Sequence, residues 1–262
     1  MKHIHAKLLF LAIFSLPFFS NASSLTKDGE FYQITVYHFS NSAQQNTIEQ
    51  YLKDAYLPAL QRQQIKSVGV FTNIANDTTA DKRLYVIYPI KSLQQFTELA
   101  GNLEKDILYQ SNGKTYLDAD YKNPPYARME KILLKAFLLA PFLNMPKLTG
   151  PKSERIYELR SYESATEKIH QNKVQMFNEG GEIDLFKQLN FNAIFYASVI
   201  AGSHMPNLMY MTSFENKADR DAHWKSFGES PIWNKMKSLP EYQNNVSKNE
   251  QSFLRATEYS NW

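Results

Sequence analysis

The pattern of apolar and polar positions predicts one order of strands twice along the chain. Short apolar or alternating runs, bounded by polar or Pro-bearing loops, indicate β-strands. In the first half these runs are 31–39, 67–74, 84–90 and 130–137; in the second half they are 155–163, 192–199, 208–214 and 250–257. Helical spacing lies between the first and second strands and between the third and fourth, so each half is expected to be β-α-β-β-α-β.

The first helix of the first half is predicted by a stripe of apolar residues. This stripe consists of Ile48, Leu52, Ala55, Tyr56 and Ala59. The corresponding helix of the second half is expected to break at Gly180–Gly181. The later helices are predicted to begin at Ser92 and Asn216, because both are capping residues with a polar partner three positions on.

The two halves also align residue by residue. Tyr32 and Tyr157, like Tyr37 and Tyr162, are separated by 125 positions. A repeat of this length indicates a duplicated domain. We therefore expect an α+β protein made of two fused ferredoxin-like (βαββαβ) domains. Such a sheet carries helices on one face only, so the two bare faces are expected to pack together in one barrel-like core.

The N-terminal segment has the order of a secretory signal peptide. A short basic stretch with Lys2 and Lys7 precedes a brief apolar run, and small residues end at Ala22. We predict a signal peptide at 1–22, a first domain at 23–142, a Pro- and Gly-containing linker at 143–152 and a second domain at 153–262. The mature protein is expected to be exported, to the periplasm or outside the cell.

Composition limits the classes of partner that we expect. The 262 residues are 43% hydrophobic, enough for a large core, and the formal net charge is only +3. Part of that charge lies in the signal segment, so no nucleic acid partner is expected. The chain has no cysteine, which excludes disulfides and thiol chemistry. No transmembrane segment is predicted after the signal segment. A small molecule or a protein is the expected partner, and further homo-oligomers are left open.

No catalytic signature appears along the chain, and no metal site is expected, because the histidines are not paired at ligand spacing. His204 falls in a loop between two strands, where an exposed histidine needs no functional role. His223 lies beside Trp224 on the helix that begins at Asn216, where it is expected to lie on the helix surface against an aromatic neighbour without a functional role. The alternative role for His223 is a proton donor or axial ligand.

Glu158 and Arg160 are the strongest candidate site residues. They lie two positions apart in a strand, so they share one face with Tyr162 while Tyr157 and Leu159 share the other. Buried charges must be paired, so the two side chains are expected to bridge the two sheets or to line a polar pocket. The first half has uncharged Gln33 and Thr35 at these positions. This asymmetry favours one functional half and one scaffold half; the alternative is divergent packing of the two halves after duplication.

The second half resembles the NIPSNAP family of the dimeric α/β-barrel superfamily. The resemblance rests on YELRSY (157–162), on MFNEGG (176–181) and on the aromatic run from Trp224 to Trp233. It implies a tandem-domain bacterial member whose two domains form an intramolecular dimeric α/β-barrel. Together with this resemblance, the absence of a catalytic signature favours a non-enzymatic small-molecule or protein-binding module of this type, without a cofactor. Two alternatives follow from the superfamily: a cofactor-poor monooxygenase or isomerase using Glu158, Arg160, Tyr162 or His223, and a haem-binding protein with His223 or His204 as axial ligand.

Overall fold

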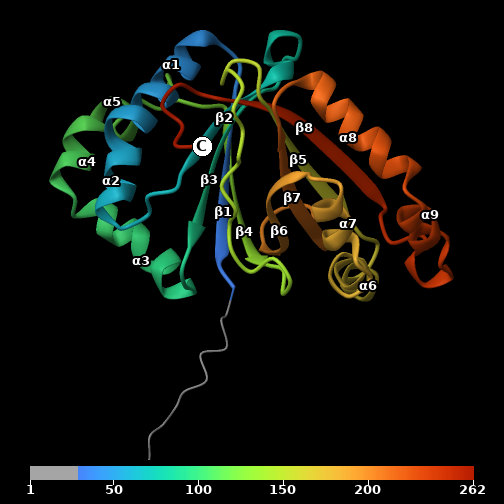
Figure 1. Cartoon of the computed structure of the whole chain (residues 1–262). Coiled ribbons are helices and arrows are strands. Elements are labelled where there is room, and N and C mark those ends of the chain that lie inside the picture. The colour runs from blue at the N-terminus through green and yellow to red at the C-terminus, as the bar shows by residue number, and fades with distance from the viewer. Residues whose placement is uncertain (1–28) are drawn as a thin grey trace, which may run out of the picture.

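A closed antiparallel β-barrel forms the centre of the molecule (Figure 1). The structure, a computed structural model, describes residues 29–262; the expected signal peptide at 1–22 lies outside them. The strands are β1 (Phe31–Phe39), β2 (Gly69–Asn73), β3 (Lys82–Ile90), β4 (Arg128–Ala136), β5 (Ile156–Glu163), β6 (Asn192–Ala201), β7 (Asn207–Phe214) and β8 (Lys248–Ala256). Their order around the barrel is β1-β3-β2-β8-β5-β7-β6-β4.

Each half contributes four neighbouring strands, and both halves follow the ferredoxin-like order. The halves meet at two seams, where β2 pairs with β8 and β4 pairs with β6. The expected α+β fold of two fused ferredoxin-like units in one barrel is therefore confirmed. The strands lie within two residues of their predicted bounds.

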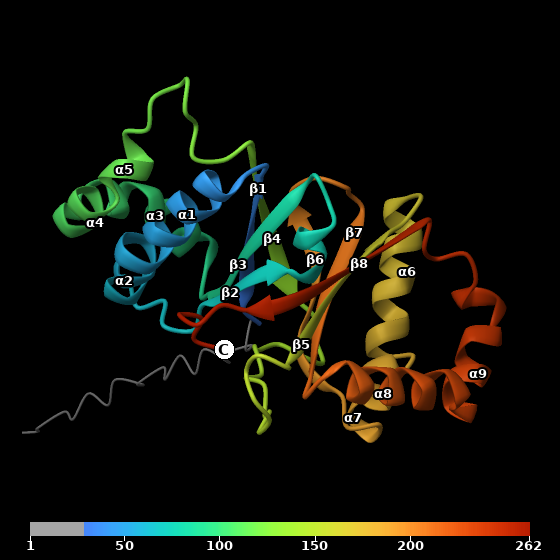
Figure 2. The same cartoon turned by 90° about the horizontal axis from the view of Figure 1, so that it is seen from above.

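Helices cover the outer faces of the barrel on two opposite sides (Figure 2). Those of the first half are α1 (Ser42–Tyr51), the π-helical turn η1 (Leu52–Tyr56), α2 (Leu57–Arg62), the 3-10 turn η2 (Ile74–Asp77), α3 (Leu93–Glu104), α4 (Ile107–Asn112) and α5 (Lys114–Leu117). Those of the second half are α6 (Glu167–Asn178), α7 (Glu182–Gln188), α8 (Lys217–Glu229), α9 (Pro231–Ser238) and the 3-10 turn η3 (Pro240–Tyr242).

The predicted capping and helix-breaking residues lie at helix ends in the structure. The hydroxyl of Ser92 accepts a hydrogen bond from the Gln95 amide at 3.1 Å, and α3 begins there. The side chain of Asn216 caps α8 in the same way. Gly181 separates α6 from α7 and adopts φ +92°, a conformation that glycine tolerates best. The π-helical turn η1 and the short helices α4 and α5 were not predicted.

The inside of the barrel is filled by side chains from both halves. Tyr32, Ile34, Phe71, Tyr157 and Leu159 belong to this buried cluster. Two further clusters lie outside the barrel, one beneath the helices of each half. Every sheet is therefore covered on both faces, and any open site must lie at a barrel end or beneath a helix layer.

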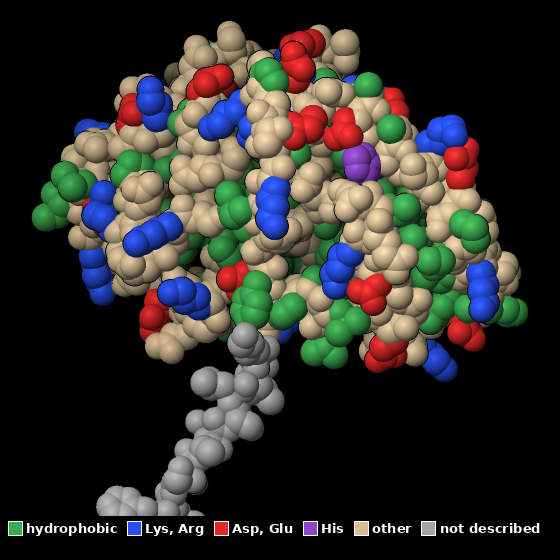
Figure 3. Space-filling model, in the orientation of Figure 1, with side chains coloured by type: hydrophobic (Ala, Val, Ile, Leu, Met, Phe, Trp, Pro, Cys, Tyr) green, Lys and Arg blue, Asp and Glu red, His purple; other side chains and the backbone are tan. Residues whose placement is uncertain are grey.

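The outer surface carries charges of both signs. On the face seen in Figure 3, acidic and basic side chains are interspersed. This face therefore presents no surface of a single sign. Within residues 29–262, no helix has the length and apolar character needed to cross a membrane.

Candidate functional site

The predicted Glu158 cluster lies on the outer face of β5, beneath α8. Glu158 is completely buried, and its carboxylate accepts hydrogen bonds from Arg160 at 2.6 Å, from Arg220 at 2.8 and 2.9 Å, and from the Trp224 indole at 2.8 Å. Arg160 is also buried, donates to the Tyr162 hydroxyl at 3.0 Å, and lies 3.7 Å from the centre of the Trp224 ring.

This cluster is packed tightly rather than open. Burial alone would raise the pKa of Glu158, but the hydrogen bonds from Arg220 and the charge of Arg160 outweigh burial and hold the pKa below its usual range. Tyr157 and Leu159, on the other face of β5, line the barrel interior. The expectation that Glu158 and Arg160 bridge the two sheets is therefore wrong: their partners come from α8 of the same half, which strand alternation alone could not show.

The two candidate histidines lie away from this cluster. The ring of His223 contacts Phe191 and Phe214, and its Nδ1 lies 2.9 Å from the Asp219 backbone oxygen. His204 lies in the loop between β6 and β7 with its side chain half exposed, and its Nδ1 is 3.2 Å from Glu163. The structure therefore joins Glu158, Arg160 and Tyr162 but separates both histidines from them.

A second buried ion pair fills more of the space beneath the helices of the second half. Lys173 of α6 and Glu182 of α7 are both buried, and their charged groups are 2.8 Å apart. Aromatic side chains surround this pair; they include Phe177, Phe186 and Phe227. The sequence analysis did not single out Lys173 or Glu182, because the pair forms only when the chain folds back at Gly180–Gly181.

The corresponding space in the first half contains a pocket of about 700 Å³. It lies between the outer face of β1 and β4 and the helices α3, α4 and α5. Its lining includes Gln33, Thr35, Tyr37, Tyr51, Tyr56, Phe96, Leu99, Ala100, Leu103, Glu104, Tyr109, Tyr116, Tyr126, Met129 and Lys131. We call this the tyrosine pocket. Its volume falls in the range of about 300–1,000 Å³ that small-molecule sites occupy.

The floor of the tyrosine pocket is formed by the counterparts of Glu158 and Arg160. Gln33 and Thr35 are 3% and 2% exposed, and the Gln33 amide donates to the Thr35 hydroxyl at 3.1 Å. These short uncharged side chains replace the long charged ones of the second half. The asymmetry seen in the sequence is therefore real, but the pocket lies in the half where the charges are missing.

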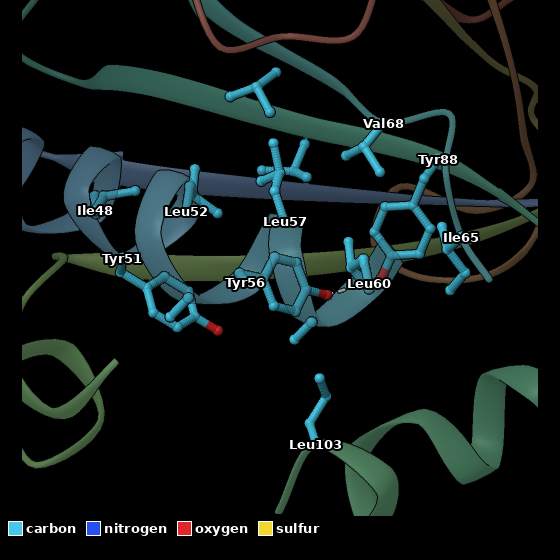
Figure 4. Packing of buried hydrophobic residues seen from close by; sticks show 14 of the residues in the cluster. Ile48, Tyr51, Leu52, Tyr56, Leu57, Leu60, Ile65, Val68, Tyr88 and Leu103 are labelled. Carbon is cyan, nitrogen blue, oxygen red and sulfur yellow. Dashed lines mark hydrogen bonds between the residues drawn. The ribbon is translucent and has the colours of Figure 1, made fainter. Parts of the chain in front are cut away.

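Tyrosine rings form much of the wall. Tyr51 stacks on Tyr116 with ring centres 3.8 Å apart and planes within 8° of parallel. The hydroxyl of Tyr51 lies 2.9 Å from that of Tyr109, and the hydroxyl of Tyr56 lies 2.8 Å from that of Tyr88. Figure 4 shows Tyr51 and Tyr56 on the same side of their helix, which faces Leu103.

The π-helical turn explains why these two tyrosines share a side. Residues five positions apart point about 140° apart in an α-helix of 3.6 residues per turn. The wider η1 turn, with hydrogen bonds spanning five residues, brings Tyr51 and Tyr56 into a stack with ring centres 5.6 Å apart. A short stretch of sequence gives no signal for this turn, so the sequence analysis missed the pocket.

The buried tyrosines hold their protons at neutral pH. Burial raises the pKa of Tyr56 to about 12, and it raises the pKa of Tyr51 and Tyr116 further. These hydroxyls can therefore donate or accept hydrogen bonds, but they do not act as bases. Within the described part of the chain, no histidine lines the pocket.

A smaller pocket of about 160 Å³ lies at one end of the barrel. Its lining includes His38, Arg83, Glu130, His204 and Glu250. This volume is below the usual range of about 300–1,000 Å³ for ligand sites. His204 lines this pocket with its side chain half exposed, and the His223 ring contacts Phe191 and Phe214, so an axial-ligand role of either histidine stays a prediction. Within residues 29–262, no three His, Asp or Glu side chains form a metal-binding group.

The closed barrel with helices on two sides defines a dimeric α/β-barrel completed within one chain. Residues 157–261 match the family described as NIPSNAP, so the second half of this chain is a NIPSNAP domain, as its sequence indicated. Comparison with curated proteins gives no match.

Solved structures share the fold over nearly the whole chain. A protein of Lactobacillus acidophilus NCFM, provisionally named a monooxygenase, aligns with a TM-score of 0.55 and 9% identity over 87% of this chain and 94% of that one. Its provisionally named counterpart from Fusobacterium nucleatum gives 0.57 and 5%, over 87% and 92%. An anthrone oxidase-like protein gives 0.51 and 9%, over 88% and 92%. At such identities the likeness shows the fold alone.

Proposed function

We propose that this chain is an exported binding protein that holds a small, flat, largely apolar molecule in the tyrosine pocket. The observation that carries the proposal is the contrast between the halves. The sheet and helices of the second half enclose buried ion pairs and aromatic rings, whereas those of the first half leave about 700 Å³. A protein that needed only a stable core would have no reason to keep this space.

The lining supports an aromatic ligand. Aromatic rings such as Tyr116 and Tyr126 line the pocket, and Leu99, Leu103 and Met129 add apolar surface. Polar groups lie on the floor, at Gln33 and Thr35, and also on the helix side and at the rim, at Glu104, Gln110 and Lys131. This mixture of apolar and polar lining groups suits a molecule that has both an aromatic body and a polar group.

Binding without catalysis is the function that this chemistry favours. The tyrosines stay protonated, so they orient a ligand rather than remove a proton from it. The second candidate is a cofactor-poor oxygenase that acts on the bound molecule. It is favoured by the open space between sheet and helices, in a fold shared with proteins provisionally named monooxygenases. Oxygen uptake measured with the protein and its bound molecule separates the two functions.

Calorimetric titration with 2-naphthol tests the proposed pocket. Ala100, an exposed lining residue of α3, is replaced with tryptophan to fill the pocket without disturbing the core. Wild type is expected to bind 2-naphthol and Ala100→Trp to lose binding. Ala222→Trp, at an exposed position of α8, is the matched control and should bind as wild type does. Failure of wild type to bind, or equal binding by Ala100→Trp, would overturn the proposal.

Export is the second part of the proposal and rests on the basic, apolar and small-residue order of residues 1–22. N-terminal sequencing of protein from the extracytoplasmic fraction should begin at Ser23. An intact Met1 in that fraction would contradict export.

A further inference from the structure

We propose that the ligand of the tyrosine pocket carries a carboxylate and that Lys131 binds it. This inference rests on the proposed function and adds the chemical class of the ligand. Lys131 lines the pocket from β4 and is paired in register with Thr35 of β1. The two side chains therefore lie next to each other on the outer face of the sheet.

The second half of this chain pairs its buried cation on this face with a carboxylate. There Arg160 is paired in register with Gln251, and Glu158 neutralises its charge at 2.6 Å. In the first half the cation is Lys131, on β4 next to β1, and uncharged Gln33 takes the position that corresponds to Glu158. Lys131 thus keeps the charge of this face but lacks the carboxylate.

The ammonium group of Lys131 has no acidic partner in the described part of the chain. No carboxylate oxygen of residues 29–262 lies within 4.0 Å of it. The adjacent Glu130 points to the opposite face, where it accepts from Ser203 and pairs with Arg128. A cation that lines a pocket and has no ion-pair partner is suited to a ligand that supplies the negative charge.

Thr35 provides the second contact for a carboxylate. Its hydroxyl accepts the hydrogen bond from Gln33 and can donate its own proton to a ligand oxygen. One cation and one hydroxyl match a single carboxylate, while the aromatic and aliphatic side chains of the lining match a hydrocarbon body. The ligand class is therefore an aromatic carboxylic acid with its acid group directed at β1 and β4.

Among residues 29–262, Glu104 is the one carboxylate that lines the pocket. It lies at the end of α3, on the helix side, and forms no ion pair with Lys131. Its negative charge opposes an acidic ligand. Lys131 and Glu104 are therefore expected to have opposite effects on affinity. Removing the charge of Lys131 should weaken binding of an acid, and removing that of Glu104 should strengthen it.

The test compares 2-naphthoic acid with its neutral isostere 2-naphthamide by calorimetric titration. Wild type should bind the acid more tightly than the amide. Because Lys131 is exposed at the rim, Lys131→Gln is expected to weaken binding of the acid about five- to tenfold and to leave the amide within about twofold. Glu104→Gln should tighten binding of the acid alone. Lys187→Gln, which removes an exposed lysine of α7, is the matched control and should change neither affinity.

The outcomes separate this inference from the proposed function. If acid and amide bind wild type equally, or if Lys131→Gln weakens both alike, the carboxylate assignment is overturned while the pocket stands. If neither compound binds and 2-naphthol also fails, the proposed function itself falls. Loss of the preference for acid at high salt would support the ion pair, because salt screens an exposed charge.

Discussion

At the scale of single residues, Glu158 organises the outer layer of the second half. Arg160, Arg220 and Trp224 all donate to its carboxylate, and none of the carboxylate is exposed. A carboxylate buried this completely would be costly if it were alone. The surrounding donors make it the anchor that holds α8 on the sheet, and they take up the space that stays open in the first half.

Glu158→Gln is expected to lower the free energy of unfolding by about 3–5 kcal/mol, because it leaves two partly or fully buried guanidinium groups without their anion. Arg160→Met should cost less, about 1.5–3 kcal/mol, since Glu158 keeps Arg220 and Trp224 as partners. Urea unfolding of both variants measures which substitution lowers the free energy of unfolding more. Glu229→Gln, at an exposed position of α8, is the control and should stay near wild type. A larger loss from Arg160→Met would contradict this account.

The same comparison has a definite pH dependence. The pKa of Glu158 lies below its ordinary value of 4.5 in the folded protein, so its stabilisation is complete above that value. As the pH falls below 4.5 through the folded pKa, the carboxylate is protonated and the stabilisation is lost. The difference in stability between wild type and Glu158→Gln should therefore shrink on going from neutral pH to about pH 3. A difference independent of pH would show that charge is not its source.

At the scale of elements, the strands were predictable because their apolar runs are short and bounded, but their faces were not. Six of the eight residues of β5 and seven of the nine residues of β1 are buried, so residues on both faces of these strands are covered. Alternation then separates Tyr157 from Glu158 without telling which one enters the barrel.

The filled and open helix layers could not be predicted for a different reason. Whether a layer is filled depends on side-chain volumes contributed by several elements at once, such as Trp224 of α8 and Arg160 of β5. The sequence did show the replacement of charged by uncharged residues at Gln33 and Thr35. It could not show that no other side chain moves into the space, nor that the η1 turn directs Tyr51 and Tyr56 toward it.

The cap of α3 provides a prediction at this scale, because α3 forms one wall of the tyrosine pocket. Ser92→Ala removes the acceptor for the Gln95 amide and should cost about 1 kcal/mol, whereas Ser92→Gly should cost only a few tenths. Denaturant unfolding measures both, and hydrogen exchange at the Gln95 amide should accelerate most in the alanine variant. Equal losses in the two variants would show that the hydroxyl does not stabilise the start of the helix.

At the scale of the whole molecule, the barrel interior joins the halves more than the seams do. The seam between β2 and β8 has three residue pairs, and that between β4 and β6 has four with a register shift. The interior cluster, by contrast, draws large side chains such as Tyr32 and Tyr157 from both sheets. Neither half can cover its inner face alone, so each depends on the other for burial of apolar surface.

Residues 153–262 expressed alone should therefore form a dimer or aggregate. Separation exposes the inner face of β5–β8 and frees the edges of β6 and β8, which normally pair with β4 and β2. Two copies can restore a closed barrel, since the free edges then pair with each other across the dimer. Light scattering after size-exclusion chromatography gives the mass, and adding the separately expressed 29–142 should convert the dimer into a complex of the two halves. A stable monomer of 153–262 with no affinity for 29–142 would contradict the role assigned to the shared interior.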